Sequence, residues 1–60
     1  MNLVEHYIIE IYDVKENKYG SEKYLIVDLQ YNCYGTIKRE KRVFTKEGFE
    51  EAKQQGYFMA

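Results

Sequence analysis

The sequence lacks most of the residues from which small proteins build cross-links and cofactor sites. It has one cysteine, one histidine, no tryptophan and no proline among 60 residues. Because Cys33 is alone, an internal disulfide is excluded, and a reduced cytosolic setting is the simpler inference. A structural zinc site needs about four Cys, His or carboxylate ligands, and His6 with Cys33 falls short of that number. We therefore expect no metal and no cofactor.

Long apolar runs are also missing. The longest unbroken run is "YLIV", whereas a helix that crosses a bilayer needs about 20 apolar residues. The start "MNLVEHY" has no basic residues followed by an apolar stretch, so we expect no secretory signal. The formal net charge is −1 at pH 7, which by itself predicts neither a polyanion partner nor a DNA mimic. We expect a cytoplasmic protein without membrane contact.

The length places the chain near the lower limit for a domain with an unaided core. A chain of this size buries only about 60% of its unfolded surface, and small domains usually add a disulfide, a metal or a partner subunit. With the first two excluded, oligomerisation or an unusually aromatic core remains. Seven Tyr and three Phe suit either solution.

Three segments have the composition of strands: residues 3–14, 23–34 and 36–44. The first is rich in β-branched and aromatic residues and has no breaker. The second alternates most clearly, because its odd positions are apolar while Asp28, Gln30 and Asn32 occupy even ones. The third is more polar. Gly20 in a polar segment and Gly35, which can adopt a positive φ, predict hairpin turns between the strands.

The last segment has the signals of a helix over residues 46–55. Thr45 is a good N-cap, glutamates follow where the helix dipole favours them, and Gly56 fits a left-handed C-cap. Phe44 and Phe49 have the spacing of a hydrophobic staple. The predicted fold is therefore α+β, a three-stranded antiparallel meander followed by one C-terminal helix, with the whole chain forming a single domain.

One face of this sheet is expected to lack a cover. If Ile9 pairs with Val27 and Ile11 with Leu25, the odd positions form the core beneath the helix. The even face then keeps several large side chains. Leaving three of them in water would forfeit ~5–8 kcal/mol, about the whole stability of a small domain. The end of the chain or the loop at 15–22 is one candidate cover for this face.

A second copy of the chain is the cover that we expect. It would bind either face to face or through pairing of the first strands at their edges. A two-fold axis makes this economical, since one patch serves both subunits. The predicted self-association residues are Ile8, Tyr12, Tyr24 and Ile26.

Catalysis is not expected. His6 shares the even face with Glu10, while Ser21 lies in a loop and Cys33 on the opposite face. A general base needs a nucleophile within hydrogen-bond reach, and this arrangement supplies none. Cys33 follows the apolar parity of its strand and is interpreted as a small buried residue. The chain is therefore predicted not to be an enzyme.

The segment "IKREKRV" places four cations around Glu40. Three interpretations fit it: an edge strand whose charges discourage aggregation, a contact for an acidic protein partner, and a β-ribbon that contacts phosphates. In the last case Arg39 and Arg42 would read bases. The predicted partner-binding residues are Tyr34, Lys38, Arg39, Lys41 and Arg42.

The stretch "YGTIKREKRVFTKEGFEEAK" resembles the amino-terminal arm-binding domain of tyrosine recombinases. Those domains run from a strand through a turn to a basic strand, then to Phe-Thr and a helix, and they insert their sheet into the DNA major groove. The resemblance covers residues 24–55 at most and rests on Phe44, Thr45 and the pair Glu51-Ala52. It implies the alternative function, a small DNA-binding protein that uses the basic third strand.

In size, composition and lack of catalytic groups, the chain is similar to small accessory proteins of phages and prophages. Lys exceeds Arg, and Ile, Tyr and Glu are plentiful, as in AT-rich genomes. Many such proteins block a host defence enzyme by binding to it, and a Tyr-rich surface of mixed charge suits protein recognition. The leading expectation is a non-enzymatic, homodimeric protein-binding module that inhibits a host protein by occluding it.

Overall fold

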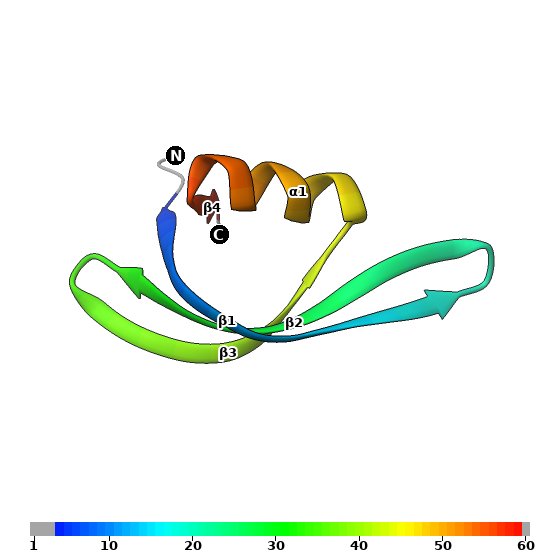
Figure 1. The fold of residues 1–60 in the computed structure, drawn as a ribbon, viewed down its shortest axis with the longest axis horizontal. Helices are drawn as coiled ribbons and strands as arrows, with labels where there is room; N and C mark the ends of the chain where they lie inside the picture. The colour runs from blue at the N-terminus through cyan, green and yellow to red at the C-terminus, as the bar shows by residue number, and fades with distance from the viewer. Residues whose placement is uncertain (1–3, 60) are drawn as a thin grey trace.

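The computed structural model describes residues 4–59. Its elements are β1 (Glu5–Tyr19), β2 (Glu22–Cys33), β3 (Thr36–Phe44), α1 (Lys46–Gln55) and β4 (Tyr57–Met59). The strands form one antiparallel sheet in the order β3-β2-β1-β4, with α1 packed on one side (Figure 1). The prediction of an antiparallel α+β fold is confirmed, whereas the prediction of only three strands is wrong.

The unpredicted strand, β4, follows the helix directly. Tyr57–Met59 pair antiparallel with Glu5–Tyr7, and the Ile8 N–H donates to the Gly56 carbonyl over 2.9 Å. A segment of this length shows no readable periodicity, which is why the sequence did not reveal it. These residues therefore extend the sheet at its edge instead of folding across the uncovered face.

The hairpin of β1 and β2 is longer than expected. The sequence predicted a loop at 15–22, but β1 continues to Tyr19 and β2 begins at Glu22, so that only Gly20 and Ser21 form the turn. Gly20 has the positive φ, 63°, that this turn requires. Figure 1 shows the resulting two-stranded arm reaching beyond α1. Polar residues are tolerated there because both faces of the arm meet solvent. Residue 3 of the predicted first strand lies outside the described residues.

Two bulges in β1 decide which side chains reach the core. The register against β2 shifts twice within residues 8–13, which leaves Ile9 and Tyr12 as extra residues. A bulge sets two residues against one on the partner strand and bends the bulged strand. The sheet accordingly bows around α1 in Figure 1. We call the side that carries the helix the concave face and the other side the convex face.

The pairing predicted from the sequence is therefore wrong. Ile11 lies opposite Leu29 rather than Leu25, and Val27 lies opposite Val14 rather than Ile9. Each bulge interrupts the strict alternation of faces along β1, so a prediction that continues one parity through the strand assigns the wrong residues to the core.

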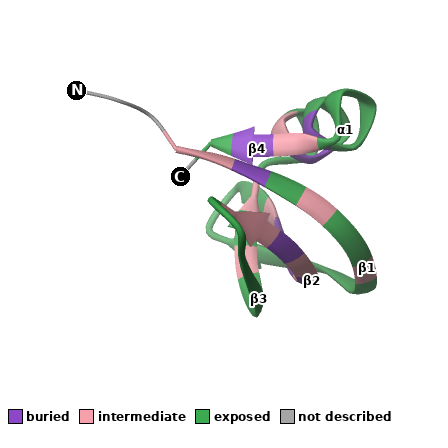
Figure 2. Ribbon diagram, turned by 90° about the vertical axis from the view of Figure 1, so that its left-hand side faces the viewer, coloured by how far each residue is buried: buried purple, intermediate pink, exposed green. Residues whose placement is uncertain are grey.

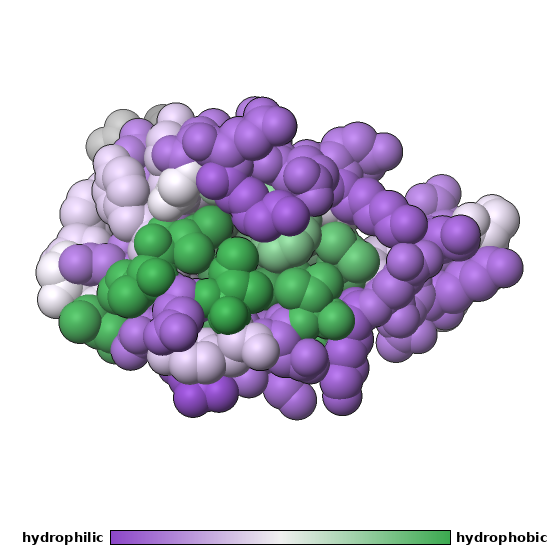
Figure 3. All heavy atoms as spheres, in the orientation of Figure 1, coloured by the Kyte–Doolittle hydropathy of each residue, from purple (hydrophilic) through white to green (hydrophobic). Residues whose placement is uncertain are grey.

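The core lies between the concave face and α1. Every second residue of β2 from Leu25 to Tyr31 is buried there, and the helix and β4 close it from above (Figure 2). The buried apolar residues are Leu25, Val27, Leu29, Tyr31, Phe49, Ala52 and Phe58. Partly buried Ile8, Ile11, Cys33 and Phe44 pack against them. Figure 3 shows apolar side chains gathered in a band between α1 and the strands.

The ends of α1 follow the signals in the sequence. The Thr45 hydroxyl accepts the Gly48 N–H over 2.9 Å, and the rings of Phe44 and Phe49 lie 5.6 Å apart between centroids. Gly56 ends the helix in the left-handed conformation, with φ at 85°. These contacts fix the angle at which the helix leaves β3 and returns over the concave face.

Candidate protein-binding site

The convex face carries aromatic, aliphatic and charged side chains together. Residues directly opposite one another in neighbouring strands share a face, so the register places Tyr7, Ile26, Ile37 and Val43 on this side. Ile37 and Val43 are 60% and 67% exposed, and Tyr7 is 52% exposed. Within residues 4–59, no helix or strand lies over this face (Figure 2). An apolar area without a cover is therefore present, and only part of its residues are those that were expected.

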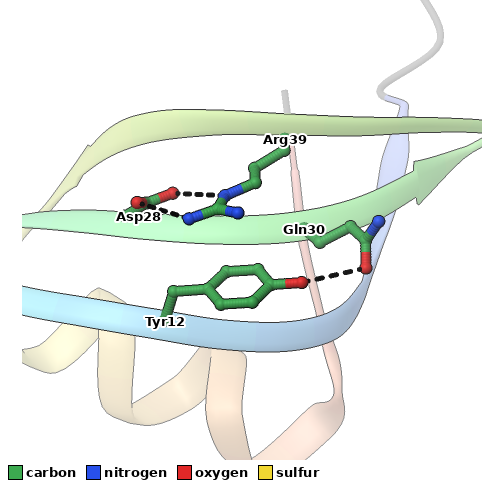
Figure 4. A network of polar contacts seen from close by, with 4 residues as sticks. All are labelled: Tyr12, Asp28, Gln30 and Arg39. Atoms are coloured by element: carbon green, nitrogen blue, oxygen red, sulfur yellow. Dashed lines mark hydrogen bonds and ion pairs between the residues drawn. The ribbon is translucent and has the colours of Figure 1, made fainter.

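A polar network joins three strands at the centre of the convex face (Figure 4). The Arg39 guanidinium donates to both carboxylate oxygens of Asp28 over 3.2 Å, and its Cζ lies 3.8 Å from the centroid of the Tyr12 ring. The Tyr12 hydroxyl donates to the Gln30 Oε1 atom over 3.4 Å. A bidentate ion pair stacked on an aromatic ring holds the arginine in one conformation. The network thus presents an exposed guanidinium group that is held by Asp28 and Tyr12.

The charges of this network stabilise each other. The hydrogen bond from Arg39 lowers the pKa of Asp28, and the same bond raises the pKa of Arg39. Both groups therefore stay ionised over the physiological pH range. An approaching partner meets a neutralised pair with further hydrogen-bonding capacity on its edges, rather than an isolated positive charge.

The predicted partner-binding residues do not lie on one surface. Arg39 and Lys41 lie opposite Gln30 and Asp28 on the convex face, whereas Lys38 and Arg42 lie opposite Tyr31 and Val27 on the concave face. Tyr34 belongs to the turn between β2 and β3, where it is 80% exposed. The alternation of faces along β3 thus divides the basic segment between two surfaces.

The predicted self-association residues are also divided. Tyr12 lies on the convex face, where it contacts Gln30 and Arg39, and Ile26 and Tyr24 lie on the same side by register. Ile8 does not join them. It lies opposite Tyr31 and packs against the core. The bulges of β1 separate Ile8 from Tyr12, which the unbroken parity of the sequence had placed together.

His6 lies in the core and not on the even face with Glu10 as predicted. It is 6% exposed, its ring stacks on Tyr31 at 4.6 Å between centroids, and it meets Phe58 edge-on at 5.1 Å. Its Nδ1 atom has no hydrogen-bond partner among residues 4–59. Next to it, the Tyr31 hydroxyl donates to Glu40 over 2.8 Å. No pattern in the sequence indicated this cluster, because its members come from different strands.

Burial lowers the pKa of His6, and the positive charges of Arg42 and Lys38 lower it further. The unfolded chain, with a pKa near 6.5, then binds a proton more readily than the folded one. The contribution of neutral His6 to the free energy of unfolding is therefore present above pH 6.5 and is lost as the pH falls from 6.5 toward the lower pKa of the folded state. Because a single proton is involved, the loss has a slope of at most about 1.4 kcal/mol per pH unit. Urea unfolding between pH 5.5 and 7.5 measures this.

The matched variant for that measurement is His6→Phe, which removes the titrating group from the same aromatic cluster. Glu40, whose pKa the Tyr31 hydrogen bond lowers from 4.5, titrates below this interval and leaves the comparison undisturbed. The free energy of unfolding of His6→Phe should be nearly constant over the interval. Parallel pH curves for the two proteins would contradict the assignment to His6.

Metal-binding clusters and membrane-spanning helices are both absent from the described residues. Across residues 4–59, no group of three or more His, Cys, Asp or Glu side chains is placed to hold a metal ion. In the same part of the chain, no helix has the length and apolar character needed to cross a membrane.

Fold and surface together define a small α+β protein in which one helix covers one side of a curved four-stranded sheet. No family model matches the chain, and no curated protein or solved structure matches it. Its function is therefore inferred from the geometry of the described residues.

Proposed function

We propose that the protein is a non-enzymatic binding module that occludes a host protein with its convex face, as small phage and prophage inhibitors do in the cytoplasm of a bacterial host. The observation that supports this function is the exposed combination of Tyr7, Tyr12, Ile37 and Val43 around the ordered Arg39. Aromatic residues and arginine are enriched in interfaces and dominate their hot spots.

Both the composition of the Arg39 network and the fixed position of its guanidinium group support a binding function. Binding normally costs conformational entropy for each long side chain that becomes fixed. Here Asp28 and Tyr12 already fix the guanidinium before any partner arrives. A partner that stacks or hydrogen-bonds on this network avoids that cost, so a small face can still bind tightly.

Self-association is assigned to the free edge of β1. β4 pairs with Glu5–Tyr7 only, so from Ile9 onward β1 has β2 on one side and no other strand on its second side among residues 4–59. Unpaired edges favour pairing with another chain. The β3 edge has five consecutive charged residues at 38–42, whereas on the β1 edge charged residues are interspersed with apolar ones, among them Ile9 and Val14, which are 49% and 43% exposed.

Edge pairing also fits the curvature of the sheet. Two bowed sheets that met through their convex faces would touch over a small central area only. Pairing of two β1 strands around a two-fold axis instead gives one continuous sheet, and it leaves both convex faces free for the target. In this arrangement the protein can form the proposed homodimer and occlude its target at the same time.

A charge-reversal variant tests the binding function. Arg39→Glu breaks the ion pair with Asp28 and puts two carboxylates side by side on the convex face, so we expect at least a 100-fold loss of affinity for the target. The matched control is Lys18→Glu, which makes the same charge change near the far end of the β1–β2 arm. Immobilised wild type and both variants are exposed to host lysate, and captured proteins are identified by mass spectrometry.

The proposal is supported if one host protein is captured by the wild type and by Lys18→Glu but not by Arg39→Glu. The wild-type protein must also inhibit the activity of that host protein. Capture that is equal for all three proteins, or a captured protein with unchanged activity, would overturn the proposal. Circular dichroism establishes that Arg39→Glu is folded.

DNA binding through β3 is the alternative function, and the geometry supports it less. Two of the four cations are already paired with carboxylates of the chain, Arg39 with Asp28 and Arg42 with Glu40. Affinity for DNA comes largely from phosphate neutralisation, and paired arginines spread over two faces contribute little to it. Salt-sensitive shifts of duplex DNA in a gel at low ionic strength would favour this alternative.

A further inference from the structure

A hollow of about 480 Å³ lies at one end of the sheet, between the start of β1 and the turn that joins β2 to β3. Its lining consists of Glu5, Tyr7, Asn32, Tyr34 and Gly35. We propose that this hollow binds a lysine or arginine side chain of the partner protein. This inference rests on the proposed function and names the chemistry by which the target is recognised.

The lining has the groups that a cation needs. The Tyr7 hydroxyl donates to the Glu5 carboxylate, and the Tyr7 ring packs against Tyr57 at 5.6 Å between centroids. Within residues 4–59, Glu5 forms no ion pair with a side chain, and the lining contains no Lys or Arg. A carboxylate beside aromatic faces attracts ammonium and guanidinium groups and repels anions.

The backbone at Tyr34 indicates that its ring is placed for a purpose. Tyr34 has a φ of 50° and is the one non-glycine residue with a positive φ among residues 4–59. Turns of this kind favour Asn-Gly, whereas this chain has Tyr34 before Gly35, at φ 83°. The Asn32 side chain accepts the Gly35 N–H over 2.7 Å and fixes the turn. An unfavourable residue held in such a conformation points to a function, here an 80% exposed ring at the rim of the hollow.

The neighbouring residue Ile37 completes the site. It lies opposite Asn32 on the same side of the sheet and is 60% exposed. Lysine and arginine carry long aliphatic stems that pack on apolar surface while their charged ends reach polar groups. Ile37 can receive such a stem and Glu5 the charged end, so the hollow fits a whole side chain better than a small free cation.

The test is a titration of the labelled protein with Nα-acetyl-arginine amide and Nα-acetyl-lysine amide, followed by amide NMR shifts. Nα-acetyl-citrulline amide, a neutral analogue of the arginine probe, is the control ligand. We expect saturable shifts centred on Asn32, Tyr34 and Gly35 with at least one cationic probe, and at least tenfold weaker binding of citrulline. Equal binding of citrulline, or no saturation with either cation, would overturn the inference.

Two variants assign the binding to the hollow. Glu5→Gln removes the negative charge and should lower the affinity for the cationic probe at least tenfold. Tyr34→Asn removes the ring but suits the left-handed turn, so the protein stays folded while binding is lost. Tyr34→Phe should bind like wild type. Wild-type affinity in both Glu5→Gln and Tyr34→Asn would place the probe elsewhere and contradict the proposal.

These titrations are independent of the target. If the probes do not bind, but a host target is captured by the wild type and not by Arg39→Glu, the cation hollow is overturned and the proposed function stands. Saturable, charge-dependent probe binding without any inhibited host protein overturns the proposed function and leaves a cation site on the protein.

Discussion

Reversal of the charge at Asp13 or at Lys15 should weaken the proposed homodimer, and reversal of both should restore it. If β1 strands pair around a two-fold axis at Val14, Asp13 of each chain faces Lys15 of the other. Neither residue forms an ion pair within residues 4–59, so both are available for this contact. Because the axis doubles each contact, one substitution replaces two attractive pairs by two repulsive ones.

The expected size of this effect follows from cross-strand pairs. Opposite charges across two strands contribute roughly 0.2–1 kcal/mol each, and the change from two attractions to two repulsions amounts to about 1–4 kcal/mol, or a roughly 5- to 900-fold rise in the dimer Kd. Asp13→Lys and Lys15→Asp should each show that rise. The double variant should return to within about threefold of the wild type.

Sedimentation velocity over a concentration series measures the three dissociation constants. Lys41→Asp is the control, since it makes the same charge change as Lys15→Asp on β3, at the opposite edge of the sheet from β1 and β4. A double variant no better than the single ones would contradict this register. A wild type that sediments as a monomer at high micromolar concentration would contradict the dimer itself.

The sequence predicted the fold where one residue type repeats with a strong period. The apolar alternation of β2 from Leu25 to Tyr31 predicted the buried face, and that face is the core. The cap at Thr45 and the glycine at Gly56 bracket the helix that the structure shows. Those features are local, since each is decided by residues a few positions apart.

The bulges could not be predicted in this way. Neither Ile9 nor Tyr12 is a glycine, and neither has another local sequence feature that indicates a bulge. They are extra residues because the register of β1 against β2 shifts at these positions. Such a shift depends on contacts between strands and not on the residues of one strand. The consequences for Ile8, which joins the core, and for Val14, which pairs with Val27, were therefore out of reach.

The candidate site was visible only in part. The many tyrosines and the mixed charge indicated a recognition surface, and Arg39 was among the residues selected. Its partners Asp28 and Tyr12 come from β2 and β1, so the network exists only once the register of three strands is fixed. The proposed cation hollow needed the same information, because Glu5 and Tyr34 are far apart in sequence and both line the pocket at the end of the sheet.

The bulges also link the stability of the fold to the proposed function. By placing Ile8 and Ile11 in the core and Tyr12 on the convex face, they supply the concave face with apolar contacts and Arg39 with its ring. A β1 strand without bulges would keep one parity, and it would then lose either the apolar contacts in the core or the aromatic ring beside Arg39. The curvature that follows from them keeps the free edge of β1 and the convex face available at the same time.

The largest loss of stability is expected for Leu29→Ala. Leu29 is fully buried in the core on the concave face, opposite Ile11. Truncating a buried leucine costs ~2–5 kcal/mol, and the whole stability of a small domain is only about 5–15 kcal/mol. We therefore expect a large fall in the urea midpoint. Ile37→Ala, which trims an exposed residue on the convex face, should cost less than about 0.5 kcal/mol.

The same experiment reports on the dimer. Because association stabilises the folded state by mass action, the midpoint of the wild type should rise with protein concentration, and Leu29→Ala should show the same dependence at a lower midpoint. Asp13→Lys should lose much of this dependence while keeping the midpoint of the dilute wild type. A Leu29→Ala midpoint within the error of the wild type would mean that Leu29 is not part of a packed core, and the placement of α1 over the concave face would then be wrong.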